Sequence, residues 1–479
     1  MVSCPPGCPV RTRIHDLIFA LALCAAVGHL AWVGWGRAKV RGGLQELVVD
    51  AQAREDDAFV LETALAAAPA RAGSGPDLVL IVLDGLRADA AAQMPELARF
   101  ASRARRYDAA RTAAPYAYAS QASMSTGLLP SEHGGIINYH GRKRGMRPDL
   151  PTLAGRLAEG GWLTASISAD ADLAYGGVLS GFDVALDDEL QPGDENLPYI
   201  QGDRVTDLAI AALRQRGDRP IFLQVRYADA ELPWIVREGD CARAVPDPRA
   251  LAPGGQLSNR KWRARRFAVL SEKRPPSPEE LETWRNAYAS ELCFLDGELG
   301  RLLSALPSVG VGPEDWVVIV GSHGTFLGEH QLVGSGWDVY EEALRVPLMV
   351  RGPGLRVGVD DTPISTMNLA RVLLAALGLP GLPEAQFSLP LPGALVSELH
   401  GVGEEGISPK LFRRFHRSRR AVLLEGYKAL LSSDGAHEAY DLAQDPHELS
   451  PQPEAPRATA LLDPLAQWTQ SLLQLGGVR

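Results

Sequence analysis

The feature that most constrains the fold of this chain is an uninterrupted apolar run over residues 78–83, which reads Leu-Val-Leu-Ile-Val-Leu. A run this short and this rich in branched residues predicts a strand that is buried on both faces. Such strands belong to parallel sheets that helices cover on both sides. Asp84 ends the run, and in open α/β sheets functional groups gather at the carboxyl ends of the strands.

The same pattern recurs along the chain and alternates with helical segments. We expect further buried strands at residues 163–167, 220–225, 316–320 and 347–350, and helices at residues 94–105, 152–159, 204–216, 278–306 and 369–377. This alternation predicts an α/β fold with a doubly wound, mostly parallel sheet flanked by helices. Short strand-like runs and a final amphipathic stretch then predict a small C-terminal α+β subdomain.

The chain divides into four predicted segments. They are an N-terminal membrane anchor or signal segment at 1–41, a linker at 42–75, the α/β domain at 76–400 and the C-terminal subdomain at 401–479. Residues 17–36 are almost uncharged and are long enough to span roughly 30 Å of hydrocarbon as a helix. We interpret them as a single-pass anchor, with the large domain outside the cytoplasm, periplasmic or extracellular. The alternative is a cleaved signal peptide, which would leave the protein secreted.

Charge and cysteine content restrict the classes of partner and the cellular compartment that we expect. The formal net charge is −10, whereas nucleic-acid binding needs a basic face, so we expect no nucleic-acid partner. Residues 230–277 show no clear periodicity but contain a basic cluster around residues 260–266. We interpret that cluster as part of a solvated, mobile loop, and the alternative is a rim that attracts an anionic ligand. Cys241 and Cys293, the cysteines of the main domain, either pair or remain free thiols.

Several motifs resemble those of one known family. They are LVLIVLDGLRAD at 78–89, ASMSTG at 122–127 with EHG at 132–134, LGEH at 327–330, YEEALRVPL at 340–348 with RGPG at 351–354, and GYKAL at 426–430 with AYDLAQDP at 439–446. In these motifs, from about residue 76 to 475, the chain resembles the sulfatases of the alkaline phosphatase superfamily. The resemblance implies the α/β fold expected above and a metal-dependent hydrolase of sulfuric esters.

The resemblance also implies where a metal ion would bind, and the chain departs from that pattern. Asp84 stands at the position of the first metal-binding carboxylate, followed by Gly85 where relatives often have a second Asp. Ser322 replaces the carboxylate of the later Asp-His pair, and His323 remains. One carboxylate and one imidazole make a poor Ca²⁺ site, while neutral histidine suits Zn²⁺ better. We therefore expect no cofactor, or at most a divalent Ca²⁺ or Zn²⁺ ion at Asp84 and His323.

The positions that the resemblance assigns to the nucleophile and to the substrate are changed as well. Ala117 stands at the nucleophile position and Gln121 at the position of the arginine that orients substrate. Ser120 is retained, either as a substitute nucleophile or as the cap of the following helix. Glu231 replaces a substrate-binding histidine and Ser335 replaces a lysine. A pocket that has lost these cations and gained a carboxylate repels an anionic ester.

Together these changes predict a membrane-tethered pseudo-sulfatase. It would bind an anionic ligand or a protein of the cell envelope, neither of which the sequence identifies. The alternative is an active, metal-dependent sulfate or phosphate ester hydrolase or transferase with a rearranged site, using Ser120 or water. We also expect Arg87 to pair with Asp84, because a buried carboxylate without a metal ion needs a partner.

Overall fold

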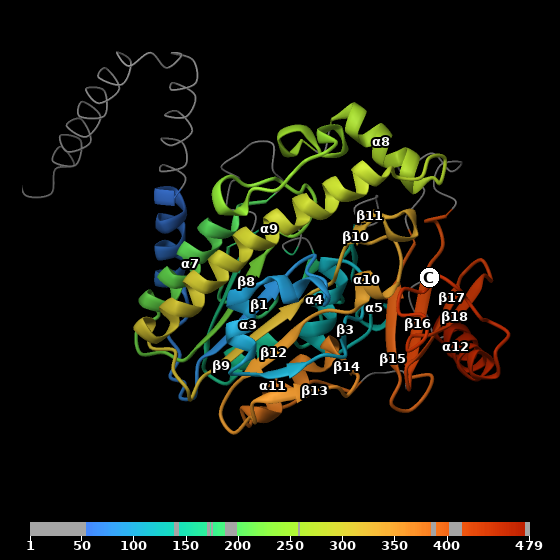
Figure 1. Ribbon diagram of the computed structural model, residues 1–479. Helices are drawn as coiled ribbons and strands as arrows, with labels where there is room; N and C mark the ends of the chain where they lie inside the picture. Colours follow the sequence, from blue (N-terminus) through green and yellow to red (C-terminus); the bar gives the residue numbers. More distant parts are fainter. Residues whose placement is uncertain are drawn as a thin grey trace, which may run out of the picture. The chain divides into compact units, whose positions relative to one another are not determined.

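An eight-stranded sheet forms the centre of the computed structural model (Figure 1), which describes residues 54–137, 143–169, 173, 176–186, 199–256, 259–384, 389–401 and 414–474. The strand order is β13-β2-β12-β9-β1-β8-β6-β7. The strands are β1 Leu78–Leu83, β2 Arg105–Tyr107, β6 Leu163–Ser168, β7 Val184–Leu186, β8 Ile221–Tyr227, β9 Trp316–Gly321, β12 Leu348–Arg351 and β13 Gly358–Asp360. The five predicted strands are thus present.

The central part of this sheet is parallel. Strand β1 pairs in parallel with β8 and with β9, and β6 pairs in parallel with β8 and with β7. Strand β12 joins β9 in the antiparallel direction. The predicted fold class, a doubly wound and mostly parallel sheet, is confirmed.

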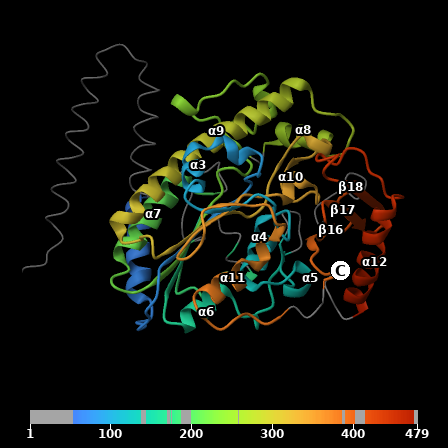
Figure 2. The same cartoon turned by 60° about the horizontal axis from the view of Figure 1, so that its bottom comes forward.

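Helices cover both faces of the sheet because the side chains of β1 alternate between two cores. Val79, Ile81 and Leu83 pack with α3 Pro95–Ala101, α7 Gly202–Gln215 and α9 Pro278–Ala305. Leu78, Leu80 and Val82 pack on the other face with α4 Ala117–Thr126, α6 Leu153–Glu159 and α11 Leu369–Ala376. Figure 2 shows α7 and α9 together on one side and α6 and α11 on the other. The five predicted helices are therefore present.

The C-terminal subdomain is a four-stranded antiparallel sheet with one helix across it. Its strands are β15 Leu395–Leu399, β16 Arg419–Leu424, β17 Tyr427–Ser432 and β18 His437–Asp441, and the helix is α12 Pro456–Gln474. Ala458, Leu461 and Leu465 of α12 pack on this sheet. Strand β15 begins before residue 401, so the sheet extends across the predicted domain boundary.

The basic cluster at residues 260–266 is helical, so the prediction of a solvated loop there is wrong. It belongs to α8, Arg260–Leu270. The helix begins at Asn259, whose side chain accepts hydrogen bonds from the backbone nitrogens of Lys261 and Trp262. Trp262 is buried and its indole donates a hydrogen bond to the Ala250 carbonyl oxygen at 3.3 Å. The buried residues of α8 are Trp262, Val269 and Leu270. They are seven or eight positions apart with arginines between them, so the sequence shows no clear helical period there.

Part of the predicted linker packs against the main domain. Residues 57–67 are helical, and Leu61 and Leu65 belong to the same core as α7 and α9. Asp57 forms a buried ion pair with Arg204 of α7. The predicted anchor at residues 17–36 lies outside the described residues. Among the described helices, none has both the length and the apolar character needed to cross a bilayer.

Candidate active site

The carboxylate of Asp84 lies at the centre of the site and is fully buried. Strand β1 delivers it beside the ends of β8 and β9, because these strands are its two parallel neighbours. One carboxylate oxygen accepts a hydrogen bond from Arg226 Nε, and the other accepts one from the Ser322 hydroxyl. Arg226, itself buried, also donates to Ser168 Oγ at 3.0 Å. The predicted site residues Asp84 and Ser322 are thus in direct contact.

This arrangement does not fit a divalent metal ion. The guanidinium of Arg226 neutralises Asp84 at the position where a cation would have to bind, and a second cation beside it would be repelled. Nδ1 of His323 faces the Gly324 carbonyl oxygen at 2.8 Å, and Nε2 has no hydrogen-bond partner among the described residues. Over the same part of the chain, no three His, Cys, Asp or Glu side chains lie close enough to hold a metal ion.

The predicted pairing of Arg87 with Asp84 is wrong. Arg87 instead forms ion pairs with Asp89 at 2.7 Å and with Glu329 at 2.8 Å. It lies on the segment that follows β1, and its backbone nitrogen donates a hydrogen bond to the Tyr288 hydroxyl at 3.1 Å. The partner that a buried Asp84 requires comes from the neighbouring strand β8.

Glu231 and Ser335, the two positions predicted to have lost a substrate-binding residue, are also in contact. The Ser335 hydroxyl donates to Glu231 Oε2 at 2.8 Å, and Glu231 Oε1 lies 3.4 Å from Nδ1 of His323. Burial raises the pKa of Glu231 above its ordinary value, and the nearby His323 acts in the opposite direction. The structure therefore places a carboxylate where the resemblance implies an anion-binding pocket.

Gly85 makes room for that carboxylate. Its φ angle is +73°, a backbone conformation that residues other than glycine rarely adopt. A Cβ atom on residue 85 would lie 2.7 Å from the Ala230 carbonyl oxygen and 2.9 Å from Glu231 Oε1. A second aspartate after Asp84 is therefore incompatible with the present position of Glu231.

Helix α4 carries the positions assigned to the nucleophile and the substrate arginine. Ala117 is its first residue and is buried, as is Gln121. Neither the nitrogen nor the oxygen of the Gln121 amide has a hydrogen-bond partner among the described residues. The helix N-cap is Tyr116, without a side-chain cap, so the prediction that Ser120 caps this helix is wrong.

Ser120 instead joins α4 to the end of β9. Its hydroxyl lies 2.7 Å from Thr112 Oγ1 and donates to the Ser322 carbonyl oxygen at 2.5 Å. Nucleophilic attack requires a hydroxyl whose proton an adjacent base can take. Among the described residues, the side-chain contacts of Ser120 are with a hydroxyl and a carbonyl oxygen, and neither is such a base.

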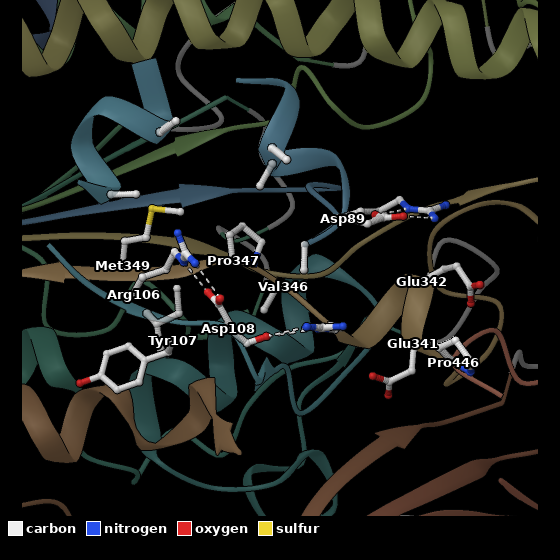
Figure 3. Close-up of a pocket in the computed structure, with 18 of the residues that line it drawn as sticks. Asp89, Arg106, Tyr107, Asp108, Glu341, Glu342, Val346, Pro347, Met349 and Pro446 are labelled. Carbon is white, nitrogen blue, oxygen red and sulfur yellow. Dashed lines mark hydrogen bonds and ion pairs between the residues drawn. The ribbon is translucent and has the colours of Figure 1, made fainter. Parts of the chain in front are cut away.

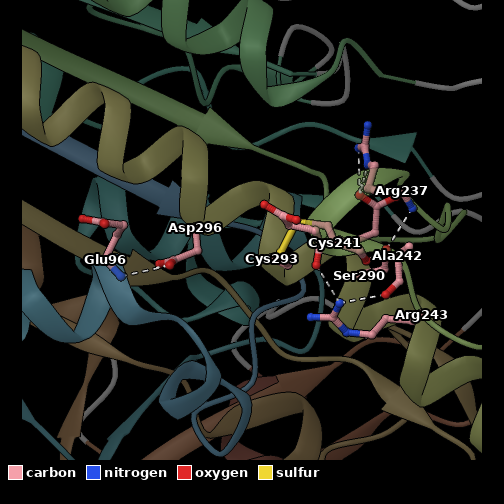
Figure 4. The surroundings of a disulfide bond; sticks show 10 residues. Glu96, Arg237, Cys241, Ala242, Arg243, Ser290, Cys293 and Asp296 are labelled. Carbon is pink, nitrogen blue, oxygen red and sulfur yellow. Dashed lines mark hydrogen bonds and ion pairs between the residues drawn. A yellow bond between two sulfur atoms is a disulfide. The ribbon is translucent and has the colours of Figure 1, made fainter.

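Next to this site, a disulfide and a buried ion-pair cluster connect the segment after β8 to α9 (Figure 4). Cys241 and Cys293 form the disulfide, with their Cα atoms 5.5 Å apart, and this decides between the two alternatives left by the sequence. Arg237 pairs with both Asp229 and Glu291. Burial raises the pKa of Asp229 to about 6 and that of Glu291 to about 8, although Arg237 acts in the opposite direction.

A cavity of about 410 Å³ opens elsewhere on the domain (Figure 3). Its lining includes Asp89, Arg106, Asp108, Glu342 and Arg345, and none of the predicted site residues contributes to it. Arg106 is paired with Asp108. The cavity is therefore separate from the buried cluster around Asp84.

Sequence reasoning missed Arg226. The predicted strand stopped at residue 225, whereas β8 continues to Tyr227 and is buried throughout. The sequence signal that could have identified Arg226 is a single charged residue in a mostly apolar strand. A buried guanidinium requires a buried carboxylate partner.

With the geometry described, comparison with known proteins decides the family. The sulfatase family model matches residues 76–379. The chain belongs to the sulfatase family. A choline-sulfatase of Rhizobium meliloti (strain 1021) is 25% identical over 444 residues, which cover 80% of this chain and 83% of that protein. An uncharacterized sulfatase of Escherichia coli (strain K12) is 25% identical over 284 residues, which cover 55% and 53%.

Solved structures share the fold of this sulfatase-family chain. A phosphonate monoester hydrolase of Agrobacterium radiobacter superposes with a TM-score of 0.64 and 20% identity, covering 84% of this chain and 96% of that chain. A protein solved with its substrate D-glucosamine-2-N,6-O-disulfate has a TM-score of 0.62 and 17% identity, covering 84% and 97%. At these identities the likeness concerns the fold, and the roles of Ala117, Gln121 and the other site positions stay predictions.

Proposed function

We propose that this sulfatase-family protein is a pseudoenzyme, which keeps the fold for binding and does not hydrolyse sulfate esters. The observation that carries the proposal is the contact between Asp84 and Arg226. Because the guanidinium takes the place of a cation, a metal ion could bind only after a buried ion pair had been broken. Breaking such a pair by removing one partner costs about 3–5 kcal/mol.

The remaining site positions support the same proposal. Ala117 has no atom that can attack an ester, and the hydroxyl of Ser120 is held by Thr112 and by the Ser322 carbonyl. Glu231 brings a negative charge to a pocket that would have to hold an anion, and Ser335 brings no positive one. Because catalytic groups that act as a unit fail together, the loss of one of them already removes most activity.

We further propose that the large domain lies outside the cytoplasm, held to a membrane by residues 17–36. The Cys241–Cys293 disulfide supports the compartment, since disulfides persist in oxidising environments. The apolar run at residues 17–36 supports the tether. The partner in this proposal is an anionic ligand or an envelope protein.

Hydrolysis and metal content test the proposal together. The purified full chain is assayed with 4-nitrophenyl sulfate and 4-nitrophenyl phosphate, before and after incubation with Ca²⁺ or Zn²⁺, and its metal content is measured by elemental analysis. We expect no hydrolysis above the rate of an Asp84→Asn variant and no stoichiometric divalent ion.

The opposite result is equally clear. A stoichiometric divalent ion, together with ester hydrolysis that Asp84→Asn abolishes, would show an active enzyme with a rearranged site. In that case an additional Ser120→Ala variant tests whether the serine is its nucleophile: loss of turnover with retained metal content would identify it.

A further inference from the structure

Positive charge is concentrated in one segment of this acidic protein. Residues 243–274 contain nine Lys or Arg residues and two Asp or Glu residues, a net charge of +7 in a chain whose net charge is −10. Asp247 and, on α9, Glu280 pair with Arg249, Arg265 and Arg274. The local excess of positive charge therefore lies with the remaining cations, among them those of α8.

Helix α8 divides its residues between an inner and an outer face. Trp262, Val269 and Leu270 are buried, whereas Arg260, Lys261 and Arg263 are exposed. Figure 1 shows α8 at the periphery of the molecule, beyond α9. We refer to Arg260, Lys261 and Arg263 as the cationic face. None of these three side chains has an ion-pair partner within the described part of the chain.

The inner face holds α8 in place. Arg265 forms ion pairs with Asp247 and Glu280. Arg266 donates to the Val333 carbonyl oxygen at 3.1 Å, and its guanidinium lies 5.3 Å from the ring centroid of Trp337. Asp247 and Glu280 are thus paired with Arg265, and the cationic face lies on a helix that these contacts hold in place. The backbone of a fixed helix loses little conformational entropy when its side chains bind a ligand.

The surroundings of the cationic face restrict the class of its ligand. No large hydrophobic side chain is exposed among the described residues of 243–274. A protein interface with an apolar centre, a helix that inserts into a bilayer and a platform for stacking nucleic-acid bases all require such side chains. The described part of this surface therefore favours a partner that binds through charge.

We propose that the cationic face binds a linear acidic polysaccharide through its carboxylate or sulfate groups. Arg260 and Arg263 present planar guanidinium groups that match the geometry of these oxyanions. They lie three residues apart, about 4.5 Å along the helix axis, so both can contact successive charges of one polymer. This goes beyond the proposed function, because the surface lies outside the buried centre and its task is binding.

Polyanion binding by the full chain tests the proposal. Fluorescent dextran sulfate and alginate serve as sulfated and carboxylated probes, with neutral dextran as the uncharged reference. We expect binding to dextran sulfate or alginate at low salt that weakens by about tenfold or more as NaCl rises to physiological concentration, because bound counterions are released. Reversal of the face in Arg260→Glu, Lys261→Glu, Arg263→Glu should abolish the binding.

The matched control reverses three exposed arginines on other elements, Arg103→Glu, Arg214→Glu and Arg356→Glu. It changes the net charge equally and should bind the probes as the parent protein does. Equal weakening in both variants, equal binding of neutral dextran or no binding at low salt would overturn the proposal. Stronger binding to anionic vesicles, poly-glutamate or an oligonucleotide would also overturn it. Because no arm measures hydrolysis, the outcome is independent of the ester assays.

Discussion

At the scale of single residues, Arg226 carries the proposal that this site does not hydrolyse esters. It is buried in β8, and its charge is balanced by a carboxylate on the adjacent strand. A cation supplied by the chain itself has no dissociation equilibrium with the solvent. The charge balance at Asp84 is therefore independent of the metal content of the medium.

Removal of Arg226 should destabilise the protein strongly. In Arg226→Met, Asp84 is left buried without a compensating charge, and we expect a loss of about 3–5 kcal/mol in the free energy of unfolding. Urea denaturation monitored by tryptophan fluorescence measures this loss.

The double variant Asp84→Asn, Arg226→Met should recover most of that loss, because it removes the unpaired charge as well. The matched control, Arg99→Met, changes an arginine that is 61% exposed and should stay within about 0.5 kcal/mol of the parent protein. An Arg226→Met variant as stable as this control would show that Asp84 does not depend on the ion pair.

At the scale of elements, a buried ion-pair cluster links the segment after β8 to α9, and its charge depends on pH. Asp229 and Glu291 share the single cation of Arg237, so burial disfavours the ionised form of both carboxyl groups. Their pKa values, raised to about 6 and about 8, exceed those of an unfolded chain, about 3.9 and 4.3. The folded protein therefore binds more protons than the unfolded chain in the range between these values.

We expect this cluster to make the protein less stable as the pH rises from about 4 to about 8. In Glu291→Gln, the decline in the free energy of unfolding between pH 6 and pH 8 should shrink by on the order of 2 kcal/mol. Urea denaturation at several pH values measures this slope. An unchanged slope in Glu291→Gln would mean that Glu291 is ionised throughout the range, and Glu159→Gln, at an exposed helix end, is the control.

At the scale of the whole molecule, the Cys241–Cys293 disulfide closes a sequence separation of 52 residues that includes the insertion with α8. A cross-link of this kind stabilises mainly by restricting the unfolded chain. The stability of the protein should therefore depend on the redox state of its surroundings.

We expect a reductant to lower the free energy of unfolding by about 2–4 kcal/mol. The Cys241→Ser, Cys293→Ser variant should be less stable by a similar amount and insensitive to the reductant. Thermal unfolding with and without dithiothreitol measures the effect, and peptide mapping without reduction identifies the bond. Finding both thiols free in protein isolated from cells would contradict the pairing.

Much of this architecture follows from the sequence because it depends on apolar periodicity. Five strands and five helices of the main domain were predictable from that period, and the family from motifs that hold the scaffold. The short strands β2, β7 and β13 and the helix α4 were not predicted. The period failed at α8, where Trp262 and Val269 are separated by a run of cations. The contacts of Arg226 with Asp84 and of Ser120 with Ser322 were not predictable either, since each joins residues more than 140 positions apart.

The glycine at position 85 has an evolutionary consequence. A mutation that introduced an aspartate there would collide with Ala230 and Glu231, and a metal ion would still meet Arg226. Each of these residues would have to change before the next change brought any benefit. Under the proposed function, a single mutation therefore cannot turn this site into a hydrolytic centre.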